Sequence, residues 1–232
     1  MKTIGLLGGM SWQSTAHYYQ LANELVATRL GGLHSAQCLL YSVDFAAIEQ
    51  MQRQGRWDDA GALLARAAKG VEAGGADLLL ICANTMHKVY DAIAEAVSIP
   101  VLHVVDVTAK AVHDAGLSTV GLLGTAFTME QSFYRDRLAS SGLNVLTPDD
   151  DERALAHRVI FDELCLGVIR DESRASFVRI INHLVERGAQ GVILGCTELE
   201  LLLSSDDADV PLFPTTRLHI EAAVNSALTT SD

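Results

Sequence analysis

Short apolar runs alternate with longer amphipathic stretches along the chain. The short runs predict buried strands, and the stretches in which apolar residues recur every three or four positions predict helices. Strands are expected over residues 3–7, 36–43, 77–82, 100–105, 119–123, 191–195 and 210–213. Helices are expected between them, with apolar faces over 21–26, 63–71, 86–97 and 177–185, and a further helix at the C-terminal end. Strands that alternate with helices predict an α/β fold with mainly parallel sheets.

Two local patterns predict where helices begin. Thr128 followed by Gln131 has the spacing of a capping box, in which a side chain before the helix and one in its first turn bond each other's backbone. The acidic run 149–152 predicts a solvated helix start, because carboxylates favour the positive end of a helix.

Three segments of the first half recur in the second half in the same order. Residues 5–9 (GLLGG) recur as 121–125 (GLLGT), residues 71–77 as 185–190, and residues 98–102 as 209–213. The offsets are 116, about 113 and 111 residues. We therefore expect an internal duplication with two similar α/β lobes, each a mainly parallel sheet flanked by helices. The expected lobes are residues 1–105 plus 214–232 and residues 106–213, with the active site in the cleft between them.

Composition excludes several classes of function. The 232 residues are 49% hydrophobic and carry a net charge of −12, from 17 Lys and Arg against 29 Asp and Glu. Nucleic acids and anionic membranes need a basic face, so neither is expected as a partner. No apolar run reaches the ~18 residues of a membrane span. The N-terminus shows no cleavable signal pattern, and the four cysteines show no paired spacing, so we expect a cytoplasmic protein with reduced thiols.

The repeat aligns two strand-to-helix junctions, residues 81–87 and 194–198, and places Ala83 opposite Cys196. Ligands of parallel α/β sheets bind at the carboxyl ends of strands. The free N–H groups at a helix start can hold a carboxylate there without lysine or arginine. The positive potential at the helix start is also expected to stabilise a Cys196 thiolate. Asn84, Thr85 and Thr197 are residue types that cap helices.

Three motifs give the chain its resemblance to the aspartate/glutamate racemase family, and within it to the broad-range amino-acid racemases. They are GLLGGMS at 5–11, NTMH at 84–87 and GCTE at 195–198, and the resemblance covers the whole chain. In this family, which needs no pyridoxal phosphate or other cofactor, two cysteines face the substrate Cα from opposite sides. One removes the α-proton, and the other delivers a proton to the opposite face.

The resemblance implies a small-molecule substrate, an amino acid or a dicarboxylate, and a homodimer as one alternative for the assembly. Cys196 is expected to be one acid/base of the reaction. The expected substrate-binding residues are Met10, Ser11, Gln52, Arg53, Asn84, Thr85, Thr125, Thr197 and Glu198. No metal is expected, because the Cys and His residues lack ligand spacing.

The chain departs from the family pattern at the first cysteine position, which is Ala83. A symmetric two-thiol mechanism is therefore excluded, and Ala83 marks the missing second acid/base, which is expected to impair the activity. Cys82 is adjacent, but a shift of one residue along a strand turns a side chain to the other face, so it is expected in the core. Thr85 and His87 are the other local candidates for the missing group.

A second departure concerns the substrate side chain. Leu166 stands where aspartate racemases of this kind carry a lysine, and the arginine expected near Ile48 is missing. Gln52 and Arg53 lie one helical turn further and can take its place. Strict aspartate specificity is therefore not expected.

Three functions remain open, and the remaining cysteines, Cys38 and Cys165, are expected to be packing residues in all of them. The leading prediction is a cofactor-independent racemase of aspartate, glutamate or a broader set of amino acids. The alternative is a single-cysteine decarboxylase or cis–trans isomerase of a dicarboxylic acid on the same fold. The third is a binding protein that has lost one catalytic group.

Overall fold

The computed structural model describes residues 1–229, which form two compact units. One unit comprises residues 1–103 and 219–229, and the other comprises Val104–Leu218. Each unit contains a four-stranded sheet in which every pair of neighbouring strands is parallel. The predicted α/β fold with parallel sheets is confirmed. None of the helices in residues 1–229 has the length and apolarity that a bilayer crossing requires.

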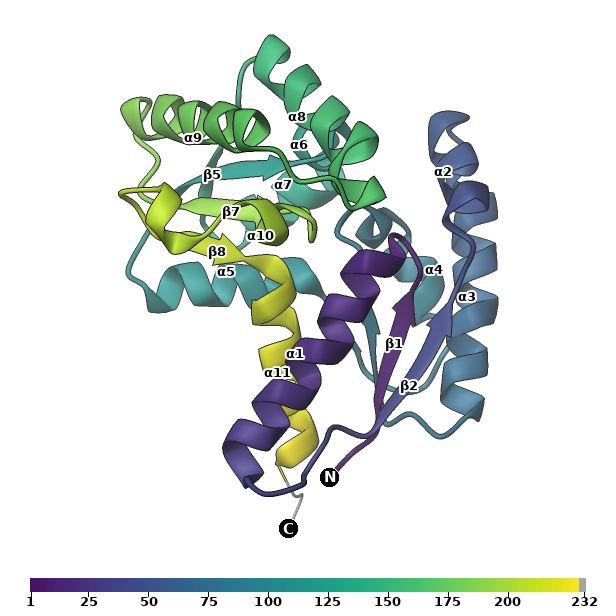
Figure 1. Cartoon of the computed structure of the whole chain (residues 1–232). Helices are drawn as coiled ribbons and strands as arrows, with labels where there is room; N and C mark the ends of the chain where they lie inside the picture. The colour runs from purple at the N-terminus through teal and green to yellow at the C-terminus, as the bar shows by residue number, and fades with distance from the viewer. Residues whose placement is uncertain (230–232) are drawn as a thin grey trace. The chain divides into compact units, whose positions relative to one another are not determined.

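The first unit carries helices on both faces of its sheet (Figure 1). Its strands, in the spatial order β2-β1-β3-β4, are β1 (Ile4–Gly8), β2 (Cys38–Ser42), β3 (Leu78–Ile81) and β4 (Val101–Leu102). One face is covered by α1 (Trp12–Leu30) and by α11 (Thr215–Leu228), which lie side by side. The other face is covered by α2 (Phe45–Arg53), α3 (Trp57–Ala73), the 3-10 helix η1 (Thr85–Val89) and α4 (Tyr90–Ala94).

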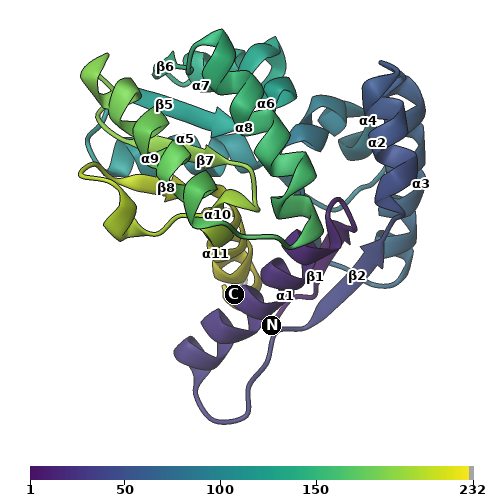
Figure 2. The same cartoon turned by 45° about the horizontal axis from the view of Figure 1, so that its top comes forward.

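The second unit has the same plan. Its strands, in the order β6-β5-β7-β8, are β5 (Thr119–Gly124), β6 (Asn144–Leu146), β7 (Val192–Gly195) and β8 (Leu212–Pro214). One face packs against α5 (Val104–Asp114) and α7 (Ser132–Ser140). The other packs against α6 (Ala126–Glu130), α8 (Asp150–Asp162), η2 (Leu164–Leu166), α9 (Asp171–Glu186) and α10 (Leu199–Leu202), with η3 (Ser205–Asp207) following α10. Figure 2 shows α8 and α9 over that face.

The strand registers reproduce the sequence repeat residue by residue. Gly5, Leu79 and Val101 lie side by side in the first sheet, and Gly121, Val192 and Leu212 do so in the second. The corresponding positions differ by 116, 113 and 111 residues, which are the offsets of the three repeated segments. The hydrogen-bonded backbone therefore supports the internal duplication independently of the side chains.

Several predicted elements are shorter than the sequence pattern indicates, and two of them differ in kind as well. The strand expected to reach residue 105 ends at Leu102, because Val104 and Val105 form the first turn of α5 and are buried there. A short apolar run does not distinguish a strand from the start of a buried helix. The helix expected over 86–97 is a 3-10 turn followed by α4, which ends at Ala94.

One of the two predicted helix starts is wrong. Thr125, not Thr128, caps α6, and its side chain accepts a hydrogen bond from the Thr128 N–H. Gln131 caps no helix with its side chain and instead separates α6 from α7. The acidic start at 149–152 is confirmed, since Asp149 and Glu152 form a reciprocal capping box at α8.

Candidate active site

The carboxyl end of β1 is a tight turn that leads directly into α1. Gly9 adopts φ +93°, and a Cβ atom there would collide with the backbone of Val43, so only glycine fits. The Gly9 N–H donates to the Thr15 hydroxyl (2.8 Å), which in turn donates to the Ser11 carbonyl (2.8 Å). The Ser11 hydroxyl accepts from the Ser14 N–H and caps α1. Met10 and Ser11 are thereby buried at the end of this strand.

The carboxyl end of β3 lies next to that of β1. Cys82 N–H donates to the Leu7 carbonyl (2.9 Å), and Ala83, Asn84 and Thr85 follow as buried residues that lead into η1. The Cys82 side chain packs on the α1/α11 face, whereas Ala83 packs on the α2/α3 face. The predicted core position of Cys82 is confirmed, and burial raises the pKa of its thiol.

His87 is directed into a cluster of buried histidines. Its Nδ1–H donates to the Ala83 carbonyl oxygen, at an N···O distance of 3.0 Å. Its ring centroid lies 4.6 Å from that of His103 and 5.8 Å from that of His219. The Nδ1 proton of His87 is therefore committed to the backbone, and the candidacy of His87 for the missing acid/base stays a prediction.

The two candidates for side-chain recognition in α2 have different environments. Gln52 is buried, and its Nε2 donates to Met86 Sδ (3.0 Å). Met86 packs in one hydrophobic cluster with Met10 and Ala83. Arg53, in contrast, is exposed and pairs with Glu49 (3.0 Å). The structure therefore brings Gln52, but not Arg53, next to the β1 and β3 junctions.

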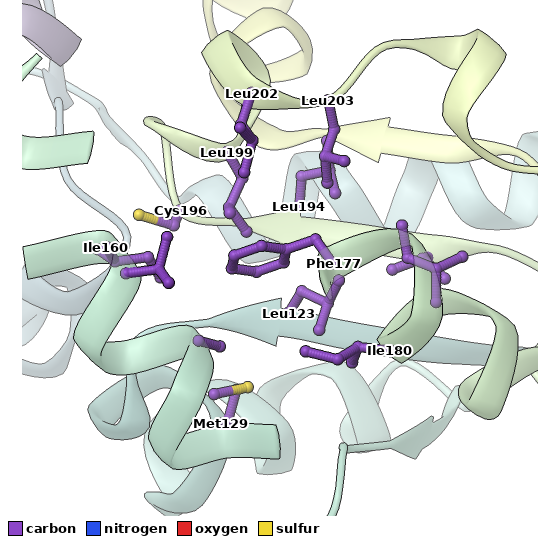
Figure 3. Close-up of a cluster of buried hydrophobic side chains, with 14 of the residues drawn as sticks. Leu123, Met129, Ile160, Phe177, Ile180, Leu194, Cys196, Leu199, Leu202 and Leu203 are labelled. Carbon is purple, nitrogen blue, oxygen red and sulfur yellow. The ribbon is translucent and has the colours of Figure 1, made fainter. Parts of the chain in front are cut away.

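Cys196 follows the last residue of β7. The offset of 113 that relates β3 to β7 also relates Ala83 to Cys196, so these residues occupy equivalent positions. Gly124 pairs with Gly195, so Thr125 and Cys196 follow neighbouring strands at the same edge of the sheet. Figure 3 shows Cys196 at the margin of the apolar cluster of this unit, with its sulfur directed away from the Phe177 ring.

The Cys196 thiol is hydrogen-bonded to a buried carboxylate. Cys196 is 6% exposed, and its Sγ–H donates to Glu198 Oε2 (3.1 Å). The Thr197 hydroxyl donates to the same oxygen (2.7 Å). Burial first, and the negative charge of Glu198 second, raise the pKa of Cys196 well above its ordinary value.

The expected Cys196 thiolate is therefore wrong for the unliganded protein. The α10 helix that follows comprises only Leu199–Leu202, so few peptide dipoles add up at its N-terminus. Desolvation and a neighbouring carboxylate both oppose ionisation of a thiol, and they outweigh so short a helix.

Sequence reasoning missed two groups that interact with Glu198. Cys165, in η2, is half-buried, and burial together with a hydrogen bond and the charge of Glu198 raises the pKa of its thiol. Burial raises the pKa of Glu200 to about 7, although the Thr216 N–H donates to its Oε1 (2.6 Å). Cys165 lies far from Cys196 in the sequence, so no spacing indicates this proximity. Glu200 lies two residues beyond Glu198. This repeat of a carboxylate is the one feature of the sequence that could have pointed to Glu200.

The structure describes each unit by itself, so the expectation that Ala83 and Cys196 face each other across a cleft stays a prediction. Within residues 1–229, no three His, Cys, Asp or Glu side chains form a group that could hold a metal ion.

Comparisons with known proteins agree with the fold. A family model described as Asp/Glu/Hydantoin racemase matches residues 7–223. The broad specificity amino-acid racemase RacX of Bacillus subtilis (strain 168) is 24% identical over 234 residues, covering 97% of this chain and 98% of that protein.

Two solved structures are also similar over nearly the whole chain. A Yersinia pestis protein, described provisionally as an Asp/Glu racemase, is 50% identical with a TM-score of 0.91. An aspartate racemase homologue from Pyrococcus horikoshii OT3 is 33% identical with a TM-score of 0.86. Each match covers 99% of this chain and 100% of the other. The resemblance inferred from the motifs is confirmed, and the chain belongs to the Asp/Glu/hydantoin racemase family of isomerases.

Proposed function

We propose that the protein racemises amino acids without pyridoxal phosphate, by removing and returning the proton at Cα. The observation that carries this proposal is the Cys196 thiol at the carboxyl end of β7, hydrogen-bonded to the buried Glu198 carboxylate. A thiol in contact with a proton acceptor is able both to give and to take a proton, which reversible exchange at carbon requires.

Each direction of the proposed proton transfer uses the same pair of groups. When the substrate carbanion is reprotonated, the neutral Cys196 thiol donates its proton to Cα. When the α-proton is removed, it moves to the Cys196 sulfur while the thiol proton moves to Glu198. The Thr197 hydroxyl bond keeps the Glu198 oxygen in place for that transfer.

The substrate α-carboxylate is held mainly by backbone N–H groups and hydroxyls near Asn84, Thr85, Thr125 and Thr197. Carbanion charge develops onto this carboxylate, and fixed N–H dipoles stabilise such charge. Because the Thr197 hydroxyl already donates to Glu198, we expect its backbone N–H rather than its hydroxyl to take part. A ligand-bound crystal structure tests this assignment, and a carboxylate paired with lysine or arginine would contradict it.

Ala83 supplies no proton at the position equivalent to Cys196. We therefore expect the two enantiomers to exchange their α-protons at unequal rates, although their equilibrium ratio is one to one. General acid–base groups contribute about 10²–10⁴-fold, which sets the expected inequality. The named relatives are described as racemases, so the alternative of a dicarboxylic acid decarboxylase or cis–trans isomerase gains no support.

Deuterium exchange tests the proposal without added cofactor. L- and D-enantiomers of alanine, aspartate, asparagine, glutamate and glutamine are incubated separately in D2O, and α-deuteration and inversion are followed by NMR and chiral chromatography. Cys196→Ala should abolish exchange, and Ala83→Cys should raise the slower direction toward the faster one. Cys38→Ser, a thiol change in β2, is the matched control and should leave both directions unchanged.

The opposite results are equally clear. Equal exchange of both enantiomers in the unmodified protein, or no effect of Ala83→Cys, would mean that position 83 is not the second catalytic position. Release of CO2 or isomerisation of a double bond in a parallel dicarboxylate assay would replace the racemase by the alternative chemistry.

A further inference from the structure

Cys165 is a thiol that the proposed proton transfer does not use. It lies in η2 between Leu164, which is buried, and Leu166, which is 69% exposed. Cys165 is half-buried and packs against the hydrophobic cluster that contains Cys196. Its side chain is therefore directed toward the interior of the second unit, on the face of the sheet to which Cys196 belongs.

The backbone that carries Cys165 is fixed by hydrogen bonds. The N–H groups of Leu166 (2.9 Å) and Val168 (3.0 Å) both donate to the Glu163 carbonyl oxygen. The Ser173 hydroxyl donates to Glu163 Oε2 (2.6 Å), which ties η2 to the first turn of α9. A turn held in this way gives the Cys165 thiol a defined position.

The Cys165 thiol is hydrogen-bonded to the Glu198 side chain. An ionised carboxylate has acceptor sites only, so the thiol is the donor in this bond. Burial first, and the charge of Glu198 second, raise the pKa of Cys165, so the thiol retains the proton that it donates.

Three residues thus donate hydrogen bonds to one carboxylate. The Cys196 thiol (3.1 Å) and the Thr197 hydroxyl (2.7 Å) donate to Glu198 Oε2, and the Cys165 thiol adds a third bond. Glu198 is 3% exposed, so protein donors must replace most of its contacts with water. Cys196 and Thr197 precede Glu198 directly in the sequence, whereas Cys165 reaches it from a separate element.

We propose that Cys165 is a positioning residue that holds the Glu198 carboxylate in the orientation in which it exchanges a proton with Cys196. Hydrogen bonds to a charged acceptor are short and directional, so a donor from η2 restricts rotation of the carboxylate. The proton that moves is that of Cys196, and the Cys165 proton stays on its sulfur. This inference rests on the proposed racemase function and replaces the packing role that the sequence predicts for Cys165.

Two substitutions distinguish a hydrogen-bond donor from a packing residue. Cys165→Val remains apolar but removes the donor, whereas Cys165→Ser keeps a donor but is smaller and more polar. We expect Cys165→Val to lower kcat for α-deuteration about tenfold with KM nearly unchanged, because a hydrogen bond to a charged group contributes about that factor or more. Cys165→Ser should retain kcat close to that of the unmodified protein. A packing role predicts the opposite order.

The control makes the same two changes at Cys38, in β2 of the other unit. Cys38→Val and Cys38→Ser should leave kcat unchanged. Melting temperatures show whether each variant is folded.

Vibrational spectroscopy tests the contact without any turnover. The S–H stretching band of each thiol is assigned by subtracting the spectrum of the variant that lacks it. A bond to a carboxylate weakens S–H, so the Cys165 band should lie at lower frequency than that of Cys38, whose pKa is raised by burial. Glu198→Gln should move the Cys165 band toward the Cys38 frequency. The Cys196 band should broaden in Cys165→Val and stay sharp in Cys165→Ser, because the serine still orients the carboxylate.

The outcomes separate this inference from the proposed function. An unchanged kcat in Cys165→Val, or a larger loss in Cys165→Ser than in Cys165→Val, overturns the positioning role and leaves the racemase intact. A Cys165 band that lies at the Cys38 frequency, or that Glu198→Gln does not move, also overturns it. If the unmodified protein exchanges no amino acid, the racemase is refuted and the Cys196 band decides: broadening in Cys165→Val that Cys165→Ser reverses supports the positioning role, and an unchanged band overturns it.

Discussion

At the scale of single residues, the proton on Cys196 is determined by the groups that surround it. Burial and the Glu198 carboxylate raise the pKa of its thiol, and Glu198 is also the acceptor of its hydrogen bond. The same carboxylate raises the pKa of Cys165. The Glu198 carboxylate thus favours the protonated form of both thiols. A protonated Cys196 is suited to the proton donation that we propose.

This arrangement predicts a slow and pH-dependent reaction of Cys196 with alkylating reagents. We expect iodoacetamide to modify Cys196 slowly at pH 7–8, because the thiolate is the reactive form. Glu198→Gln removes the negative charge while keeping the size of the side chain, so alkylation should begin at a lower pH. Mass spectrometry at each pH measures the modified fraction. An onset that stays in place or moves to higher pH in Glu198→Gln would contradict the assignment.

The raised pKa of Glu200 predicts that the stability of the protein depends on pH near 7. Burial raises the Glu200 pKa to about 7 in the folded protein, above the ordinary value of 4.5. Between these values the folded state binds more protons than the unfolded state, so the stability that Glu200 contributes is lost as pH rises through 7. Glu200→Gln stays neutral and still accepts from the Thr216 N–H.

We therefore expect Glu200→Gln to stabilise the protein at pH 8 by about 1–3 kcal/mol and to have little effect at pH 4.5. Urea unfolding at the two pH values measures the difference. Equal effects of the substitution at both pH values would show that Glu200 does not titrate in this range.

At the scale of secondary-structure elements, helices begin where a nearby side chain accepts a hydrogen bond from a free backbone N–H group. Ser11 caps α1, Thr125 caps α6, and Asp149 with Glu152 caps α8. Each cap lies directly before the first helical residue and accepts N–H groups that have no partner inside the helix. The caps of α1 and α6 also end the turns that follow β1 and β5, so each fixes the carboxyl end of one strand in its own sheet.

The α8 cap gives a direct test. Asp149→Ala removes the acceptor of the Glu152 N–H and should destabilise the protein by about 1 kcal/mol. The matched control is Asp151→Ala, an exposed acidic residue of the same turn that is not the cap. Urea unfolding compares the two, and an Asp151→Ala effect as large as that of Asp149→Ala would assign the stabilisation to charge rather than to capping.

At the scale of the whole molecule, we expect the two units to differ in their response to acid. The first unit contains His219, whose Nε2–H donates to the Leu102 carbonyl (3.0 Å) and whose Nδ1 accepts from the Tyr18 hydroxyl (3.0 Å). These two bonds leave no site for a second proton. Burial, and then the charge of His87, lower the pKa of His219 to about 3.

The sign of the resulting pH dependence follows from the unfolded state. Unfolded His219 has a pKa of about 6.5, so between pH 6.5 and 3 the unfolded state binds the proton and stability falls as pH decreases. At pH 5 the loss relative to pH 7.5 is about 2 kcal/mol. His219→Gln keeps one donor and one acceptor and should remove this loss, whereas His34→Gln, on an exposed loop, should not.

Hydrogen exchange at pH 5 and 7.5 locates the effect. The amides of β1, β3 and α1 should lose protection at pH 5 more than those of β5, β7 and α9, because His219 packs against the first group of elements. Equal loss of protection in both units would mean that acid destabilises the molecule through groups other than His219.

The sequence by itself determined the α/β fold, the duplication and the equivalence of Ala83 with Cys196. These features rest on backbone register and on apolar periodicity, which are local and recur with the offsets of 116, 113 and 111. Local patterns were ambiguous at two places. Val104 fits either the end of a strand or the start of a buried helix, and Thr128 has the side chain of a helix cap although Thr125 is the cap.

Only the tertiary structure decided the chemistry of the individual groups. The protonated state of Cys196 depends on burial and on Glu198, and Cys165 approaches from a distant part of the chain. His87 is hydrogen-bonded to the Ala83 carbonyl. It packs against His103 and His219, which lie 16 and 132 residues further along the chain. The Gln52 Nε2 group contacts Met86 Sδ, although the two residues are 34 positions apart in the sequence. Desolvation and pairing between residues far apart in sequence set these properties, and no pattern along the chain encodes them directly.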